Sequence, residues 1–172
     1  MRNPVMHVAA LAAVLFTAGC AHVPHPGAVA EARMQPTKGH DVRGSVQFRQ
    51  AGNAVEVVAS LSGLAPGLHG FHVHEKGDCS AADGTSARGH FNPAGKPHGH
   101  PGHGHAGDLP MLQADAQGRA QLQAMVPGLR VEPGASGIVG RAVIVHAAPD
   151  DFQTQPTGNS GARVACGVIA PR

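Results

Sequence analysis

The sequence contains no tryptophan, no tyrosine and only five phenylalanines among its 172 residues. It is rich instead in turn-forming residues, with 24 glycines and 14 prolines. Many turn formers with few large side chains argue against a helical bundle and favour short strands joined by long, shaped loops. The length suits one domain with a hydrophobic core of its own.

Charge is also sparse, since charged residues make up 14% of the chain and the formal net charge is +2. Lysines and arginines do not cluster with aromatic residues, which excludes a nucleic-acid-binding stripe. The abundant residue is histidine, with 13 copies, most of them between His69 and His105. Because imidazole ligates transition metals and changes charge near neutral pH, this composition indicates metal chemistry.

No long hydrophobic run is present, and the apolar stretch near the N-terminus, "VMHVAALAAVLF", is too short to cross a bilayer. Together with Arg2 before it and "TAGC" after it, this stretch predicts a secretory signal over residues 1–19. Cys20, directly after Ala18 and Gly19, resembles the lipobox cysteine of bacterial lipoproteins, which is lipidated and becomes the new N-terminus. The alternative is cleavage nearby without a lipid. We therefore predict export to the periplasm, with attachment to the envelope membrane through a lipid on Cys20.

Residues 20–40 lack periodicity and predict a flexible tether, in which His22 and His25 are expected to be solvated, although they could bind metal loosely. The folded domain is then expected over residues 41–172.

The chain has three cysteines, so lipidation of Cys20 would leave Cys79 and Cys166 as a pair in an oxidising compartment. The alternative is two buried free thiols.

Alternating polarity marks the predicted strands. In residues 41–50, Val42, Val46 and Phe48 share one face and polar residues the other, and further strands are expected at 54–64, 68–74, 117–126, 140–146 and 163–170. Short strands separated by turns predict an all-β sandwich or barrel. Two loops, 75–109 and 147–162, are unusually long, and such loops in a compact domain are functional or disordered.

Histidines of the first loop can form metal sites with histidines on strands. His72 and His74 lie two residues apart, so on a strand they project from one face, although alone they could be a solvated pair. His146 ends a strand, and the loop adds further donors at His90, His98, His105 and Asp108. All-imidazole ligation suits Cu(II), whereas three imidazoles and a carboxylate in a tetrahedron suit Zn(II).

From about residue 40 to 170 the chain resembles copper-zinc superoxide dismutases in their exported bacterial form. The resemblance rests on "GLHGFHVHE", "GHFNPAGKPHG", "HAGDLP", "VIVHAAPDD" and "GNSGARVACGVI", which occur in the order typical of the family. It implies a flattened eight-stranded Greek-key barrel with long metal-binding and electrostatic loops. The implied reaction is dismutation of superoxide to oxygen and hydrogen peroxide by a redox-cycling copper, which would protect the cell envelope.

The resemblance also implies a role for each site residue. Copper would be bound by His72, His74, His90 and His146, and zinc by His90, His98, His105 and Asp108, so that His90 bridges the two ions. Asp150 would link a copper histidine to a zinc histidine, Arg163 would attract the superoxide anion, Cys79 and Cys166 would form a disulfide, and His69 would be structural.

The sequence departs from the family pattern in its loops. His100 and His103 add imidazoles to the first loop, where they could scavenge metal or have no role. Residues 152–162 contain no charge, which weakens the expected electrostatic guidance of the substrate. These departures leave open an alternative function, a non-catalytic copper or zinc storage module on the same fold. They also leave the oligomeric state open between a monomer and a homodimer.

Overall fold

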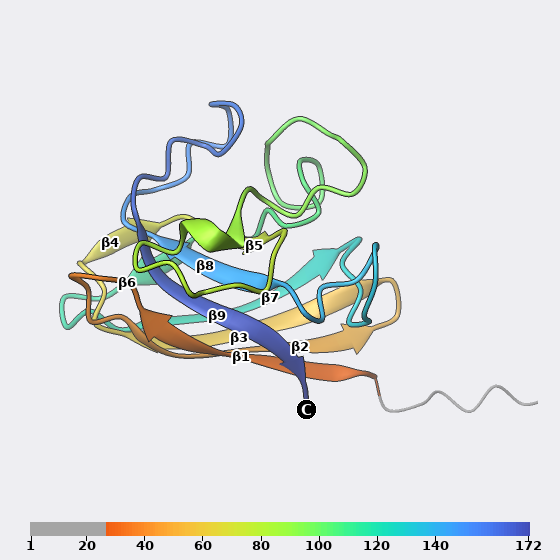
Figure 1. Cartoon of the computed structure of the whole chain (residues 1–172), viewed down its shortest axis with the longest axis horizontal. Coiled ribbons are helices and arrows are strands. Elements are labelled where there is room, and N and C mark those ends of the chain that lie inside the picture. Colours follow the sequence, from red (N-terminus) through yellow and green to blue (C-terminus); the bar gives the residue numbers. More distant parts are fainter. Residues whose placement is uncertain (1–26) are drawn as a thin grey trace, which may run out of the picture.

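The computed structural model describes residues 27–172, and it places nine strands in one antiparallel sheet (Figure 1). The strands are β1 (Val29–Pro36), β2 (Arg43–Ala51), β3 (Ala54–Ser62), β4 (Gly67–His69), β5 (Phe71–His74), β6 (Leu112–Ala114), β7 (Ala120–Pro127), β8 (Ala142–His146) and β9 (Arg163–Pro171). A 3₁₀ turn, η1 (Thr85–Ala87), is the only helical element among these described residues, and none of their helices could span a membrane. The all-β prediction is confirmed.

The sheet closes almost completely into a barrel. Its strand order is β4-β6-β7-β3-β2-β1-β9-β8-β5, so the two edge strands are β4 and β5, which only Gly70 separates in the chain. One continuous stretch therefore pairs with β6 through β4 and with β8 through β5. Counted as one strand, β4 and β5 give the predicted eight, and the pairing of β9 with β1 and of β7 with β3 supplies the Greek-key crossovers.

Alternation of side chains builds the core. In β2, Val46 and Phe48 are buried, and in β3 every second residue from Val55 to Leu61 is buried. Burying a large apolar side chain such as Phe48 contributes about 1.5–3 kcal/mol. The strands predicted at 41–50 and 54–64 are thereby confirmed.

The flexible tether predicted for residues 20–40 is wrong over Val29–Pro36. This segment is β1, which lies between β2 and β9 and buries Ala30, Ala32 and Met34. The alternation was present in the sequence, but two of its three buried side chains are only methyl groups, so the apolar signal was weak. Residues 1–26, with the predicted signal, Cys20, His22 and His25, lie outside the described residues.

Two long loops leave adjacent strands and rise on the same side of the barrel (Figure 1). The first long loop, residues 75–111, follows β5, and the second long loop, residues 147–162, follows β8, which pairs with β5. A disulfide between Cys79 and Cys166 ties the first long loop to β9, with the two Cα atoms 5.8 Å apart. The predicted loops and the predicted disulfide are confirmed, and together they define one region above β5 and β8.

Candidate metal centre

The site begins with two paired strands. All four residues of β5 are buried, including His72 and His74, and His146 ends the neighbouring β8. The first long loop returns along β5, because isolated β-bridges join His74 to His90 and His72 to Asp108. Backbone pairing thus brings donors from three parts of the sequence to one place.

The predicted donors gather in two buried groups that share one residue. The four-histidine group contains His72, His74, His90 and His146, and the Asp108 group contains His90, His98, His105 and Asp108. Within each group the ligand atoms lie within 4.8 Å of one another. Four imidazoles suit Cu(II), and three imidazoles with a carboxylate suit tetrahedral Zn(II).

Contacts outside the groups decide which ring nitrogen each histidine offers. His74 Nδ1 lies 2.7 Å from the carbonyl oxygen of Arg88, and His146 Nδ1 lies 3.2 Å from that of Gly161. A carbonyl can only accept, so both Nδ1 atoms carry the proton and both Nε2 atoms keep a free lone pair. The two Nε2 lone pairs are thereby directed into the four-histidine group.

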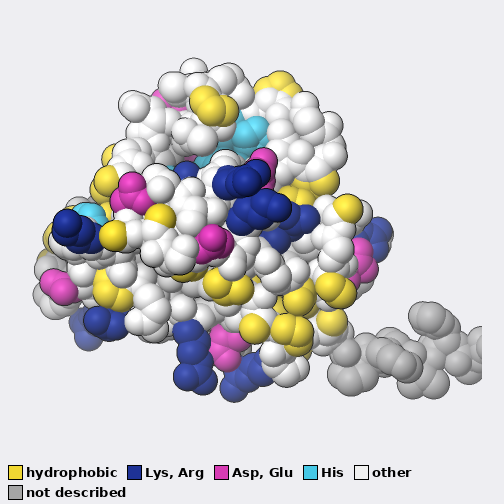
Figure 2. Space-filling view, viewed as in Figure 1, with side chains coloured by type: hydrophobic (Ala, Val, Ile, Leu, Met, Phe, Trp, Pro, Cys, Tyr) yellow, Lys and Arg dark blue, Asp and Glu magenta, His cyan; other side chains and the backbone are white. Residues whose placement is uncertain are grey.

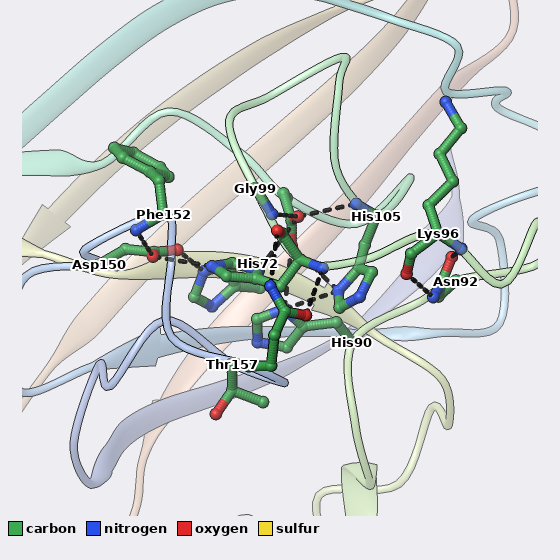
Figure 3. Close-up of polar contacts among 12 residues, drawn as sticks. His72, His90, Asn92, Lys96, Gly99, His105, Asp150, Phe152 and Thr157 are labelled. Carbon is green, nitrogen blue, oxygen red and sulfur yellow. Dashed lines mark hydrogen bonds and ion pairs between the residues drawn. The ribbon is translucent and has the colours of Figure 1, made fainter.

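Asp150 performs the same task for one histidine of each group. Its Oδ2 lies 2.6 Å from His72 Nε2, and its Oδ1 lies 2.9 Å from His98 Nε2 (Figure 3). Because the carboxylate oxygens accept from both rings, the Nδ1 atoms of His72 and His98 are left as free lone pairs. Asp150 therefore links the two groups, as the resemblance implied, and fixes both ring orientations.

His90 presents one nitrogen to each group. Its Nδ1 lies 2.9 Å from Asp108 Oδ1 and 3.3 Å from His105 Nδ1, whereas its Nε2 faces the other histidines. The His90 ring stacks on the His72 ring with centroids 3.9 Å apart. A single imidazole in this position can ligate two ions at once.

Five buried ring nitrogens have no hydrogen-bond partner within residues 27–172: His72 Nδ1, His74 Nε2, His90 Nε2, His98 Nδ1 and His146 Nε2. His98 Nδ1 does lie 3.1 Å from Asp108 Oδ2, but not in hydrogen-bond geometry. An unsatisfied buried polar atom costs about 1–3 kcal/mol, so five in one place are unfavourable without a ligand. All five belong to the two groups, and this set of lone pairs fits bound metal ions.

The electrostatics of the groups also fit metal ions, which need neutral imidazoles. Burial lowers the pKa of His72 and His74 well below 6.5, and neighbouring imidazoles lower it further. Burial likewise lowers the pKa of His146 to about 4. Burial alone would raise the pKa of Asp108, but its hydrogen bonds with His90 and with the backbone N–H of Gly99 and its electrostatic interactions with His98 and His105 outweigh this and lower it. At neutral pH the carboxylate is thus ionised and these imidazoles are neutral.

Arg163 lies beside the four-histidine group at the start of β9. Its guanidinium donates to the carbonyl oxygens of Gly84 at 2.7 Å and Arg88 at 2.6 Å. The Arg88 oxygen also accepts the hydrogen bond from His74, so one carbonyl joins the cation to this histidine. In Figure 2, histidine side chains lie at the base of a hollow, with lysine and arginine side chains along its lower edge. This arrangement can draw an anion toward the histidines.

Among the described residues, four other histidines lie outside both groups: His40, His69, His100 and His103. His69 is buried, with its Nδ1 2.7 Å from the His146 oxygen and its Nε2 2.8 Å from the Ala65 oxygen, as suits a structural residue. His100 stacks on Phe152 with ring centroids 4.3 Å apart, and His103 is exposed. Neither addition to the first long loop belongs to a group of three or more donors in the described part of the chain.

Two residues that support the site, Arg88 and Gln155, were not predicted from the sequence. Arg88 acts through its carbonyl, and Gln155 through two hydrogen bonds with the backbone of His98. Contacts with a backbone atom leave no residue-type signal in the sequence. Only the lack of charge in residues 152–162 marked the second long loop as unusual.

Comparisons with known proteins agree with this geometry. A family model described as copper/zinc superoxide dismutase matches residues 42–169. Copper-zinc superoxide dismutase 2 of Aquifex aeolicus (strain VF5) is 37% identical over 147 residues, which cover 81% of this chain and 85% of that protein. Copper-zinc superoxide dismutase 1 of the same strain is 37% identical over 133 residues, covering 73% of this chain and 79% of the relative. The crystal structure of the clock protein EA4 superposes with a TM-score of 0.75 and 38% identity, covering 87% of this chain and 98% of that one.

Proposed function

Because this chain belongs to the copper/zinc superoxide dismutase family, we propose a specific place for each of its two metals. The chain is an oxidoreductase that converts superoxide into oxygen and hydrogen peroxide, with copper and zinc as cofactors. Copper would be held by the four-histidine group and zinc by the Asp108 group, and His90 would contribute a nitrogen to each. The observation that carries this assignment is the set of five buried, unpartnered imidazole nitrogens.

The protein's own residues supply orientation, charge and a proton site. Bound copper supplies one-electron redox chemistry, and zinc, which has none, fixes its ligands. Arg163 stays protonated, and its guanidinium, held by two carbonyls, compensates the charge of superoxide beside His74. Forming hydrogen peroxide from two superoxide anions consumes two protons. His90 Nε2, which faces the four-histidine group, is the atom of the chain that we assign to hold one of them.

Replacing His146 with alanine tests the assignment. His146→Ala removes one donor from the four-histidine group only, so we expect the chain to lose copper and keep zinc. Metal analysis and electron paramagnetic resonance measure this loss, and pulse radiolysis measures the accompanying fall in superoxide decay. The matched control is His103→Ala, which removes an exposed imidazole of the first long loop outside both groups and should change none of these. Copper binding and superoxide decay that survive His146→Ala would refute the assignment.

We also propose that the chain is exported to the periplasm and anchored to the envelope membrane through a lipid on Cys20. Two observations support this: the signal-like pattern before Cys20, and the Cys79–Cys166 disulfide, a bond typical of oxidising compartments. Metabolic labelling with palmitate should mark the chain, and Cys20→Ala should abolish the label. A label that persists in Cys20→Ala contradicts the lipid anchor.

A further inference from the structure

The second long loop crosses toward the first long loop at its tip. We call residues 152–158 of this tip the strap; they carry no charge and cannot guide an anion by electrostatics. Their contacts converge instead on His98, a member of the Asp108 group, and on its neighbours. The strap thus connects the two loops at the zinc side of the site.

Gln155 makes the most specific of these contacts. The backbone N–H of His98 donates to Gln155 Oε1 at 2.8 Å, and Gln155 Nε2 donates to the His98 carbonyl oxygen at 3.0 Å. The same Nε2 donates to the carbonyl oxygen of Gln153 at 3.1 Å. The side-chain amide pairs with both backbone groups of His98 as a neighbouring strand would, and it can do so in one orientation only.

The strap also touches the ring of His98 through Asp150. The backbone N–H of Phe152 donates at 2.7 Å to Asp150 Oδ1, the same oxygen that faces His98 Nε2 (Figure 3). Gly158 packs against this pair so closely that a Cβ there would lie 2.6 Å from His98 Nε2. The Phe152 ring stacks on His100, two residues beyond His98. The strap therefore contacts the backbone of His98, the carboxylate that orients its ring, and the neighbouring residue His100.

We propose that Gln155 is a positioning residue that keeps His98 Nδ1 directed at the zinc ion, and that the strap and zinc stabilise each other. The proposal rests on the zinc assignment made above. When the strap is in place, His98 has one backbone position and one ring orientation. Zinc binding then costs His98 little further conformational entropy. By thermodynamic reciprocity, bound zinc stabilises the strap as much as the strap stabilises zinc.

Zinc release from the fully metallated protein tests this. Gln155→Leu removes both hydrogen bonds with His98 at nearly constant size, and Gln155→Glu keeps the acceptor but loses the donor. We expect Gln155→Leu to release zinc to a chromogenic chelator about tenfold faster than the unchanged chain, because the two partly exposed hydrogen bonds that hold the backbone of His98 are lost. Gln155→Glu should release zinc faster as well. The matched control, Gln153→Leu, alters an exposed side chain of the same strap and should release zinc at the original rate.

Two further measurements separate positioning from general loosening. Copper content and the copper resonance spectrum should be unchanged in Gln155→Leu, whereas Co(II) placed in the zinc site should show an altered absorption spectrum. Unchanged zinc release in Gln155→Leu, or equal loss of copper and zinc, overturns the positioning role. Failure of the zinc assignment is distinct, because then His98→Ala would leave zinc release from the otherwise unchanged chain unaffected.

Discussion

Arg88 holds an unusual place among single residues of the site. It stands between η1 and His90 with a φ of 64° and a ψ of −148°, a backbone region that costs a non-glycine residue about 1–3 kcal/mol. Its carbonyl oxygen accepts from both His74 Nδ1 and the Arg163 guanidinium. The strained backbone therefore directs one oxygen at both His74 Nδ1 and the Arg163 guanidinium.

Replacing Arg88 with glycine should raise stability. Glycine adopts this conformation without strain and keeps the carbonyl, while its greater freedom in the unfolded chain offsets part of the gain. We expect Arg88→Gly to increase the free energy of unfolding by about 1 kcal/mol, and Arg88→Val, which adds β-branching, to decrease it. Urea unfolding of the metallated protein measures both, and a destabilised Arg88→Gly would contradict the account.

At this scale the sequence could identify the donors but not their geometry. Spacing and family resemblance sufficed to name the seven residues that the fold gathers in two groups. The choice of ring nitrogen depends on oxygens of Arg88, Gly161 and Asp150, two of which are backbone atoms that any residue would supply. Patterns of residue type contain no information on such contacts.

At the scale of elements, β1 shows how a weak pattern can hide an essential strand. It joins β2 to β9, so without it the sheet between these strands is open. β2 and β3 were predictable because valine, leucine and phenylalanine alternate with polar residues, whereas β1 alternates mainly alanine. β6, with three residues, is too short for any periodicity. Neither of the two strands that the sequence did not predict contains a long alternation of large apolar residues.

Truncation tests the importance of β1. A chain of residues 41–172 lacks β1 and the buried Met34, and it exposes the edges of β2 and β9. We expect the free energy of unfolding to fall by more than about 5 kcal/mol, which is a large part of the stability of an ordinary domain. The truncated chain should therefore show no cooperative urea transition by circular dichroism. A chain of residues 27–172 keeps β1 and serves as the control. Equal urea midpoints for the two chains would show that β1 is dispensable.

At the scale of the whole molecule, one covalent bond joins the site to the barrel. The Cys79–Cys166 disulfide spans a sequence separation of 87 residues and connects the first long loop to β9. A loop of this length corresponds to about 4 to 5 kcal/mol of stabilisation in the chain-entropy model. Cys166 and Cys79 also pack with Ala87, Ala142 and Ile144 in a small cluster next to the main core. The bond therefore fixes the loop segment that leads to His90.

Reducing this disulfide should loosen the first long loop before the barrel. We expect faster amide hydrogen exchange in residues 75–90 and a lower urea midpoint after reduction, with β2 and β3 still protected. Cys20→Ser carried through the same treatment controls for the third cysteine. Titration that finds Cys79 and Cys166 as free thiols in the folded, untreated protein would contradict the prediction.

Metal removal should make the stability of the whole molecule strongly dependent on pH. An unfolded histidine titrates near pH 6.5, whereas burial lowers the pKa of His146 in the fold to about 4. Between these values the unfolded state binds more protons, so the free energy of unfolding falls as the pH falls through this window. His146 alone corresponds to about 3 kcal/mol, and His72 and His74, whose pKa values burial also lowers, act in the same direction. Urea unfolding of the metal-free protein at pH 7, 6, 5 and 4 measures the slope, which should be smaller in metal-free His146→Ala. A free energy of unfolding that is constant from pH 7 to 4 would mean that these imidazoles are not held neutral by burial.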